Sequence, residues 1–336
     1  MEIAGPVCYP RIMADADVPT YAQLRDNVPP GSSWGVFERD PERGTANFAG
    51  AEEVLAAAAT VTRGAVFNLD LPLDAFDPPM ARARKAPRHA LFATHAEARD
   101  DVLDGFYPQS SSQIDGLRHR RASGLGFYNG VPDAEIEPGQ PALGVQRWAV
   151  QPIVGRGVVV DVAGLLAAEG TPLDHRAGPA LDVAVLDRAL RAQGEQVRPG
   201  DLLLVHTGWA RWYLDADPEV RAEVWAAQRT TGFAQSVEFP EWLWDHRVAV
   251  LASDTFAVEV MPPRPDSPFR DSAPEDAGMM HQELIAKLGV PLGELWDLTE
   301  IVADSRRHGR WDALVVVKPL HLVGGVGSPP NATALR

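Results

Sequence analysis

The features that most constrain the fold are short runs of apolar residues that alternate with helical patterns. Residues 157–162, 202–205 and 248–252 are such runs, and their length suits strands that are buried on both faces. Residues 181–193 have helical spacing, and Asp217-Pro218 opens a second helical segment that extends to about residue 228. Strands and helices that alternate in this way predict the α/β class.

The remaining segments give a coarser outline. Helices are expected at 51–63 and 276–288, and strands at 65–71 and 313–319. Residues 72–90 are rich in proline and arginine and predict a loop. We interpret the basic cluster at 82–89, within that loop, as solvated.

Charge and composition exclude several classes of protein. The net charge of −15 argues against nucleic-acid binding, which depends on Lys and Arg contacts to phosphate. No apolar run approaches the roughly 18 residues of a membrane helix, and the first residues lack the basic and apolar regions of a secretory signal. The single cysteine, Cys8, excludes an internal disulfide and a Cys-rich zinc site. We therefore expect a cytoplasmic protein that acts on a small molecule.

Two of the apolar runs end in polar residues. His206-Thr207 follows one run, and Asp254-Thr255 follows another. Ligands of α/β proteins usually bind beyond the ends of strands, so both pairs are candidates for a site. His206 could equally be a core histidine bonded to the backbone, and Asp254 could cap a turn.

The densest polar stretch is 109–119. In an extended chain, alternate residues share a face, which would bring Gln109, Gln113, Asp115 and His119 together. Such a face could hold an ion or polarise a small substrate. A polar surface loop would have a similar composition.

Residues around this stretch add two further hypotheses. The aromatic side chains of Phe106, Tyr107, Phe127 and Tyr128 could form a wall for a planar substrate, or could belong to the core. Ser110 to Ser112, with Asp115 and His119, would supply the residue types of a serine hydrolase, a less favoured alternative.

The polar stretch resembles the signature H-x-G-T-H-x-D-x-P-x-H of the metal-dependent cyclase family, which includes kynurenine formamidase and isatin hydrolase. Asp115 falls on the aspartate of this signature and His119 on its last histidine. Gln109 and Gln113 fall on the two metal-binding histidines, with Ser112 on the threonine and Leu117 on the proline.

A second segment supports this resemblance. His281 and Glu294, with the Leu and Gly residues between them, match the second signature of the family, and the similarity extends from Trp34 to Asn331. The resemblance implies a swivelling β/β/α architecture with a mixed sheet and flanking helices. It assigns 34–336 to one catalytic domain and leaves 1–33 as an N-terminal arm. It also implies a homodimer or homotetramer.

The resemblance further implies a site and a reaction. Gln113, Asp115, His281 and Glu294 would bind a divalent metal, Mn²⁺ or Zn²⁺, and His119 would carry protons. The substrate would lie against Gln109, Asp254 and the aromatic residues Phe106, Tyr107 and Tyr128. A site of this kind would hydrolyse a small cyclic or acyl amide, or a lactone.

The two glutamines leave other interpretations open. A glutamine amide is a poorer zinc ligand than imidazole, and an oxygen-rich ligand set suits Mn²⁺ or Mg²⁺ better. The metal could instead be absent, with the pocket serving a cyclase or dehydratase of a small biosynthetic intermediate. A third alternative is a binding protein without catalysis.

Overall fold

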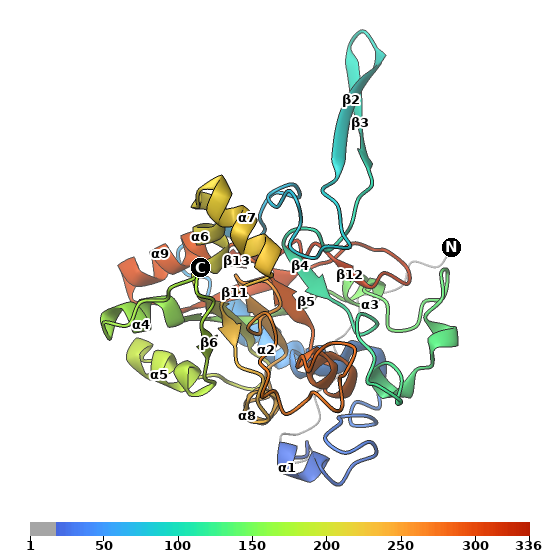
Figure 1. The fold of residues 1–336 in the computed structure, drawn as a ribbon, viewed down its shortest axis with the longest axis vertical. Helices are drawn as coiled ribbons and strands as arrows, with labels where there is room; N and C mark the ends of the chain where they lie inside the picture. Colours follow the sequence, from blue (N-terminus) through green and yellow to red (C-terminus); the bar gives the residue numbers. More distant parts are fainter. Residues whose placement is uncertain (1–17) are drawn as a thin grey trace.

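The computed structural model describes residues 18–336, and residues 1–17, with Cys8, lie outside the described part. A curled mixed sheet forms the centre of the molecule (Figure 1), in the strand order β1-β13-β11-β5-β7-β9-β10-β4-β12. Its strands are β1 (Val66–Asn68), β13 (Thr333–Leu335), β11 (Asp312–Val317), β5 (Ile153–Asp161), β7 (Leu202–His206), β9 (Val250–Ser253), β10 (Leu292–Glu294), β4 (Gln113–Asp115) and β12 (Gly327–Ser328).

The middle of this sheet is parallel and its two flanks are antiparallel. Strands β5, β7, β9 and β10 run parallel to one another, whereas β11 pairs antiparallel with β5 and β4 pairs antiparallel with β10. The parallel strands are buried along nearly their whole length, as expected for strands covered on both faces. The predicted α/β fold with a mixed sheet is confirmed.

Helices cover this sheet. The helix α2 (Ala51–Ala58) packs against β5 and β11, and α9 (Thr299–His308) packs against β5. Next to them, α4 (Val162–Ala168) contacts β7, and α5 (Ala184–Gln193) contacts β5. Among residues 18–336, no helix is both long and apolar enough to cross a bilayer.

Further elements lie outside the central sheet. They are the helices α1 (Tyr21–Leu24), α3 (Gln146–Val150), α6 (Trp209–Asp215), α7 (Pro218–Ala227) and α8 (Glu238–Asp245), the 3-10 turns η2 (Pro41–Phe48), η3 (Tyr128–Gly130) and η4 (Asp133–Glu135), and the small sheet of β6 (Ala180–Leu181) with β8 (Gly232–Phe233).

The helix expected at 276–288 is shorter than predicted. Ala277 and Gly278 both have positive φ angles, of 53° and 87°, and two successive residues in this conformation cannot continue an α-helix. The helical segment therefore begins only after His281, as the π-helix η5 (Gln282–Lys287). A π-helix often marks a functional site, and His281 stands directly before this one.

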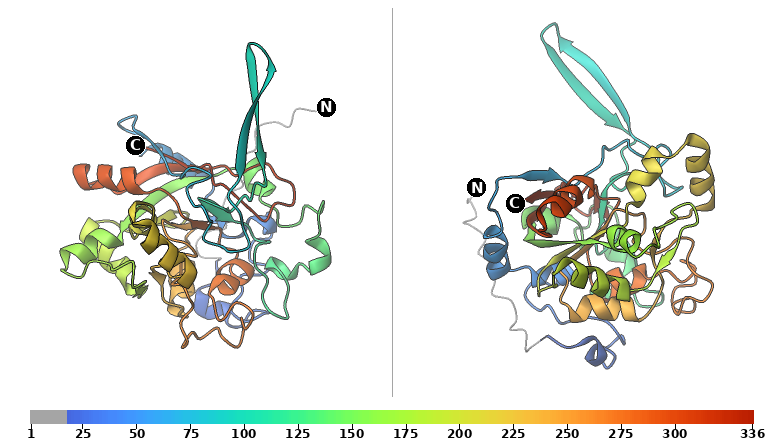
Figure 2. Two further views of the ribbon diagram at one scale, coloured as in Figure 1. Left: turned by 45° about the horizontal axis from the view of Figure 1, so that its top comes forward. Right: turned by 90° about the vertical axis from the view of Figure 1, so that its left-hand side faces the viewer.

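A hairpin that the sequence did not predict projects from the body of the molecule. Strands β2 (Arg88–His95) and β3 (Ala98–Asp104) pair only with each other and extend away from the sheet (Figures 1 and 2). All of β2 is exposed, including Leu91 and Phe92. Because neither face is buried, these strands lack the alternation that marks a half-buried strand in a sequence.

The described part of the expected N-terminal arm packs against α8. The backbone NH of Tyr21 donates to Asp245, and the indole NH of Trp244 donates to the Pro19 carbonyl. Leu24 is buried there. The division of the chain at residue 33 and the homodimer or homotetramer both stay predictions.

A charged cluster closes the carboxyl end of β5. Asp161 accepts hydrogen bonds from Arg306 Nε at 2.7 Å, His206 Nδ1 at 2.9 Å and the backbone NH of Gly164 at 2.9 Å, the last of which caps α4. Burial raises the pKa of Asp161, but the bonds from His206 and Arg306 outweigh it and lower the pKa to about 2. The ionised carboxylate therefore stabilises the fold.

We expect Asp161→Asn to lower the free energy of unfolding by about 2 kcal/mol at pH 7. Because the folded pKa lies below the unfolded value, the ionised group stabilises above about pH 4, and this contribution disappears as the pH falls toward 2. Chemical denaturation at pH 7, followed by thermal unfolding down to acid pH, would measure it. The matched control is Asp215→Asn, which removes an exposed pair with Arg211; an equal loss in both variants would contradict the prediction.

Candidate active site

The site is built where β4 pairs with β10. In the antiparallel register Gln113 lies opposite Glu294, and Asp115 lies opposite Leu292. Gln113 and Asp115 share one face of β4, whereas Ile114 points to the other face and is fully buried. The Trp296 indole NH donates to the Gln113 carbonyl at 2.9 Å, which adds to the ladder that fixes this register.

A tight turn then returns the chain to the site. The backbone NH of His119 donates to the Gly116 carbonyl at 2.9 Å, so the stretch is not extended beyond Asp115, contrary to the prediction of one continuous face. A Cβ atom on Gly116 would lie 2.7 Å from the Val326 carbonyl oxygen, which leaves no room for a side chain. The turn places His119 Nε2 3.4 Å from Asp115 Oδ2.

The two residues of the second signature, His281 and Glu294, lie beside Asp115 of the first. His281 Nε2 lies 3.2 Å from Glu294 Oε1. Asp115, His281 and Glu294 are all buried, and each offers one ligand atom that lies within 4.8 Å of those of the other two. The structure thus brings together three of the four predicted metal ligands, beside the predicted proton carrier His119.

Glu259, which the sequence analysis did not single out, holds His281 in place. One carboxylate oxygen lies 2.5 Å from His281 Nδ1, and the other accepts from Gln235 at 2.7 Å and from the backbone NH of Met280 at 2.8 Å. A carboxylate on the far nitrogen of a histidine is the arrangement that commonly orients a metal ligand. No sequence pattern marked Glu259, because it approaches His281 from another part of the fold.

Burial and charge shift the pKa values of the cluster in different directions. Burial, together with the charge of Glu294, raises the pKa of Asp115 to about 6. Burial alone would lower the pKa of His281, but its bonds to Glu259 and Glu294 raise it to about 10. Burial and neighbouring positive charges lower the pKa of His119, so this imidazole is neutral at physiological pH and can accept a proton.

Both glutamines direct their amide NH₂ groups at carboxylates. Gln109 Nε2 donates to Asp115 Oδ1 and lies 3.4 Å from His119 Nδ1. Gln113 Nε2 donates to Glu294 Oε2 at 2.6 Å, and its Oε1 accepts from Arg84 at 2.7 Å. Gln113 is therefore adjacent to the cluster, but it presents a hydrogen-bond donor to it rather than a ligand atom.

Arg84 corrects the interpretation of the basic cluster at 82–89 as solvated. Arg82, Lys85 and Arg88 are exposed, but Arg84 is half-buried and also donates to the Gln109 carbonyl at 2.5 Å. One arginine of a Pro-rich loop thus reaches the site, which the composition of the loop did not indicate.

His119 connects the buried cluster to a pocket of about 370 Å³. The walls of this pocket include Arg120, Ser123, Phe127 and Gln282. Arg120 Nη1 lies 3.5 Å from Asp276, and Gln282 accepts from the Ser123 backbone NH at 3.0 Å. A small molecule in this pocket would contact His119 before any residue of the cluster.

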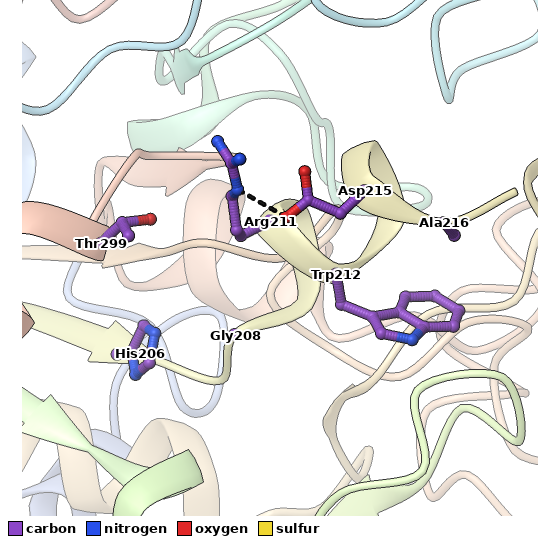
Figure 3. A pocket seen from close by; sticks show the side chains of 7 residues that line it. All are labelled: His206, Gly208, Arg211, Trp212, Asp215, Ala216 and Thr299. Carbon is purple, nitrogen blue, oxygen red and sulfur yellow. Dashed lines mark hydrogen bonds and ion pairs between the residues drawn. The ribbon is translucent and has the colours of Figure 1, made fainter.

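The predicted strand ends form a separate cluster. Because β7 and β9 are parallel neighbours, His206 Nε2 lies 3.8 Å from Asp254, and Asp254 accepts from the backbone NH groups of Thr207 and Gly208. His206 borders a different hollow of about 510 Å³ with Trp212 and Thr299 (Figure 3). Asp254 thus caps the β7–α6 turn and is not among the residues that line the His119 pocket.

The aromatic residues of the predicted wall lie in different parts of the structure. Tyr128 is fully buried, and its hydroxyl lies 3.1 Å from Ser33 Oγ, so it belongs to the core. Phe127 lines the His119 pocket. Phe106 and Tyr107 are half-buried at the base of the hairpin, and their contact with a substrate stays a prediction.

The serine residues do not form a nucleophilic site. Ser111 donates to the Pro72 carbonyl and Ser112 to the Leu295 carbonyl. The chain has one Gly-x-Ser-x-Gly segment, 31–35, the spacing of a nucleophile elbow, but Ser33 donates to the Leu288 carbonyl at 2.9 Å. Within the described residues, none of these three hydroxyls bonds to a histidine.

The ligand atoms of Asp115, His281 and Glu294 suit a divalent cation. Asp115 Oδ2 is buried and accepts no hydrogen bond from any residue that the structure describes. Glu294 Oε1 supplies a second ligand atom, and His281 Nε2 supplies a third once the incoming cation displaces its proton, while Glu259 orients the imidazole. Two carboxylates and one imidazole are a ligand set that Mn²⁺ and Zn²⁺ both accept.

We expect Glu259→Gln to lower the free energy of unfolding by about 2–3 kcal/mol, because the amide keeps one oxygen and its new NH₂ would face either His281 Nδ1 or the NH groups of Gln235 and Met280. Urea unfolding followed by tryptophan fluorescence would measure the loss. Glu275→Gln, at the exposed rim of the pocket, is the matched control. The same midpoint in both variants would show that Glu259 does not support His281 as described.

Comparisons with known proteins agree with this fold. A family model described as "Putative cyclase" matches residues 68–260, and no curated protein sequence matches the chain. A crystal structure described as a novel cyclase is 30% identical, with a TM-score of 0.77, and the match covers 91% of this chain and 99% of that chain. Isatin hydrolase A from Ralstonia solanacearum is 16% identical, with a TM-score of 0.54 and coverage of 84% and 96%.

An isatin hydrolase bound to the product analogue thioisatinate is also similar, at 16% identity, a TM-score of 0.51 and coverage of 81% and 92%. At such low identity, the two isatin hydrolases show a shared fold. The family model spans more than half of the chain, and the novel cyclase matches nearly all of it. The expected membership is confirmed: this protein belongs to the cyclase family.

Proposed function

We propose that the protein is an enzyme that hydrolyses a small cyclic or acyl amide, or a lactone. The observation that carries this proposal is the buried group of Asp115, His281 and Glu294, whose ligand atoms lie close enough together to hold a cation, with a neutral His119 between this group and a pocket. The similarity to isatin hydrolases supports the same reaction class.

His119 and Asp115 would have different roles in such a hydrolysis. A substrate in the pocket would meet His119, whose imidazole can take a proton from the attacking water. Asp115, 3.4 Å away, would stabilise the positive charge that His119 then carries. His119 would return the proton to the leaving nitrogen or oxygen as the C–N or C–O bond breaks. An acyclic substrate then gives an acid and an amine, and a cyclic substrate gives one ring-opened molecule that carries the acid and the amine or alcohol.

Asp115, His281 and Glu294 would hold a divalent cation, Mn²⁺ or Zn²⁺. A cation at this position would increase the acidity of water and polarise the substrate carbonyl. Burial of the three side chains excludes bulk water from around them. The residues that hold the cation are thus distinct from the residue that moves the proton.

We expect His119→Ala to lower kcat by about 10²–10⁴-fold, because it removes the proton carrier. Turnover would be measured with a panel of aryl formamides, lactams and lactones, and thermal unfolding would verify the fold. His308→Ala, an exposed histidine at the end of α9, should keep full activity. Wild-type turnover in the His119 variant would refute its role.

We expect the purified protein to bind about one equivalent of Mn²⁺ or Zn²⁺ per chain, and Asp115→Ala to lose it, because a principal ligand is removed. Mass spectrometry of metal content before and after chelation would measure this. The control variant is Asp215→Ala, an exposed carboxylate on α6. Retention of the metal in the Asp115 variant would place the cation elsewhere.

One observation favours a second candidate, a metal-free cyclase or dehydratase. Gln109 and Gln113 already donate hydrogen bonds to the carboxylates of Asp115 and Glu294, so these carboxylates have partners without a cation. Asp115 and His119 would then transfer protons directly. Activity that survives exhaustive chelation would select this candidate over the first.

A further inference from the structure

The guanidinium of Arg84 lies at the two positions where this chain has glutamine in place of the metal-binding histidines of the family signature. Its Nη1 donates to Gln113 Oε1 at 2.7 Å and to the Gln109 carbonyl at 2.5 Å. Gln109 and Gln113 fall on the two metal-binding histidines of the signature. A cationic side chain therefore contacts both residues that have lost the imidazole.

The bond from Arg84 determines the orientation of the Gln113 amide. Because Oε1 accepts from the guanidinium, Nε2 faces the cluster and donates to Glu294 Oε2 at 2.6 Å. An amide NH₂ has no lone pair for a cation, whereas the amide oxygen has two. Gln113 can act as a ligand only if its side-chain amide flips so that Oε1 faces the cation. This flip breaks the hydrogen bond to Arg84.

The positive charge of Arg84 also opposes the binding of a cation at the cluster. Asp115 and Glu294 are almost fully buried, and charges in such surroundings are screened much less than charges at the surface. A guanidinium beside two carboxylates supplies part of the positive charge that a divalent cation would supply. It also repels a cation that approaches the same carboxylates.

We propose that Arg84 sets the affinity of the site for a divalent cation, because it holds the Gln113 amide turned away and opposes the charge of the cation. This inference rests on the proposed function only in placing the cation at Asp115, His281 and Glu294. Arg84 is then a positioning residue, and its charge opposes that of a cation near the same two carboxylates. The site consequently binds a divalent cation more weakly than its three donors would without Arg84.

The test is Mn²⁺ binding to chelator-treated full-length protein, measured by isothermal titration calorimetry and by the electron paramagnetic resonance signal of free Mn²⁺. The variants are Arg84→Met and, as the matched control from the same loop, Arg82→Met. Arg82 donates to the Ala226 carbonyl and lies over the Trp225 ring, away from the cluster. We expect Arg84→Met to bind Mn²⁺ at least about tenfold more tightly than the wild type, and Arg82→Met to bind as the wild type does.

Equal Mn²⁺ affinity in the wild type and in Arg84→Met would overturn the role of Arg84 and leave the proposed cation site intact. Absence of binding in all variants, also after titration with Zn²⁺, would overturn the cation site itself and the inference with it. The two failures are thus distinguishable without any measurement of turnover.

A second variant covers the case in which Arg84→Met does not fold, as judged by circular dichroism. Arg84→Lys keeps a positive charge, but its shorter side chain ends before the position of Nη1, the nitrogen that donates to both acceptors. We expect it to bind Mn²⁺ at least about threefold more tightly than the wild type, because the Gln113 amide is then free to turn. Unchanged affinity in this variant would likewise overturn the role of Arg84.

Discussion

Two carboxylates buried side by side, those of Asp115 and Glu294, are the constraint on which the organisation of the site depends. They come from adjacent antiparallel strands and are both almost fully buried. Two such charges repel one another and lose their hydration, so the fold needs compensating groups around them. The amides of Gln109 and Gln113, the imidazole of His281 and the guanidinium of Arg84 are these groups.

The compensating groups come from distant parts of the chain, so the site also contributes to the tertiary structure. Arg84 belongs to the loop before the hairpin, and Gln113 belongs to β4. His281 precedes the π-helix, and Glu259 follows β9 and holds the imidazole. Functional residues of this kind also stabilise the fold, because each of them satisfies another buried polar group.

The sequence predicted the central sheet because parallel strands that are buried on both faces leave apolar runs in the sequence. It also indicated Asp115, His119, His281 and Glu294, through two matching signatures. Glu259 and Arg84 could not be predicted, since each acts through a contact between segments that the sequence keeps apart. A single carboxylate or a single loop arginine belongs to no local sequence pattern that would mark it as part of a site.

The strand-end argument applies to His206 and Asp254 but does not extend to Asp115. Parallel pairing of β7 with β9 does bring His206 and Asp254 together. Asp115 lies on β4, which joins the sheet beyond β10 and runs antiparallel to it. The direction of β4 depends on long-range pairing, which the short polar stretch does not encode by itself.

The bond between Arg84 and Gln113 also bears on how such a site can evolve. With histidines at 109 and 113, an arginine at 84 would lose the amide oxygen that now accepts from it, and would face metal ligands instead. With glutamines at both positions and no arginine, the two carboxylates would lack part of their compensating charge. Either intermediate leaves buried charge unbalanced, so single substitutions at these positions carry a penalty that the combination does not. Positions 84, 109 and 113 are therefore energetically coupled, because Arg84 bonds to both of the other residues within this chain.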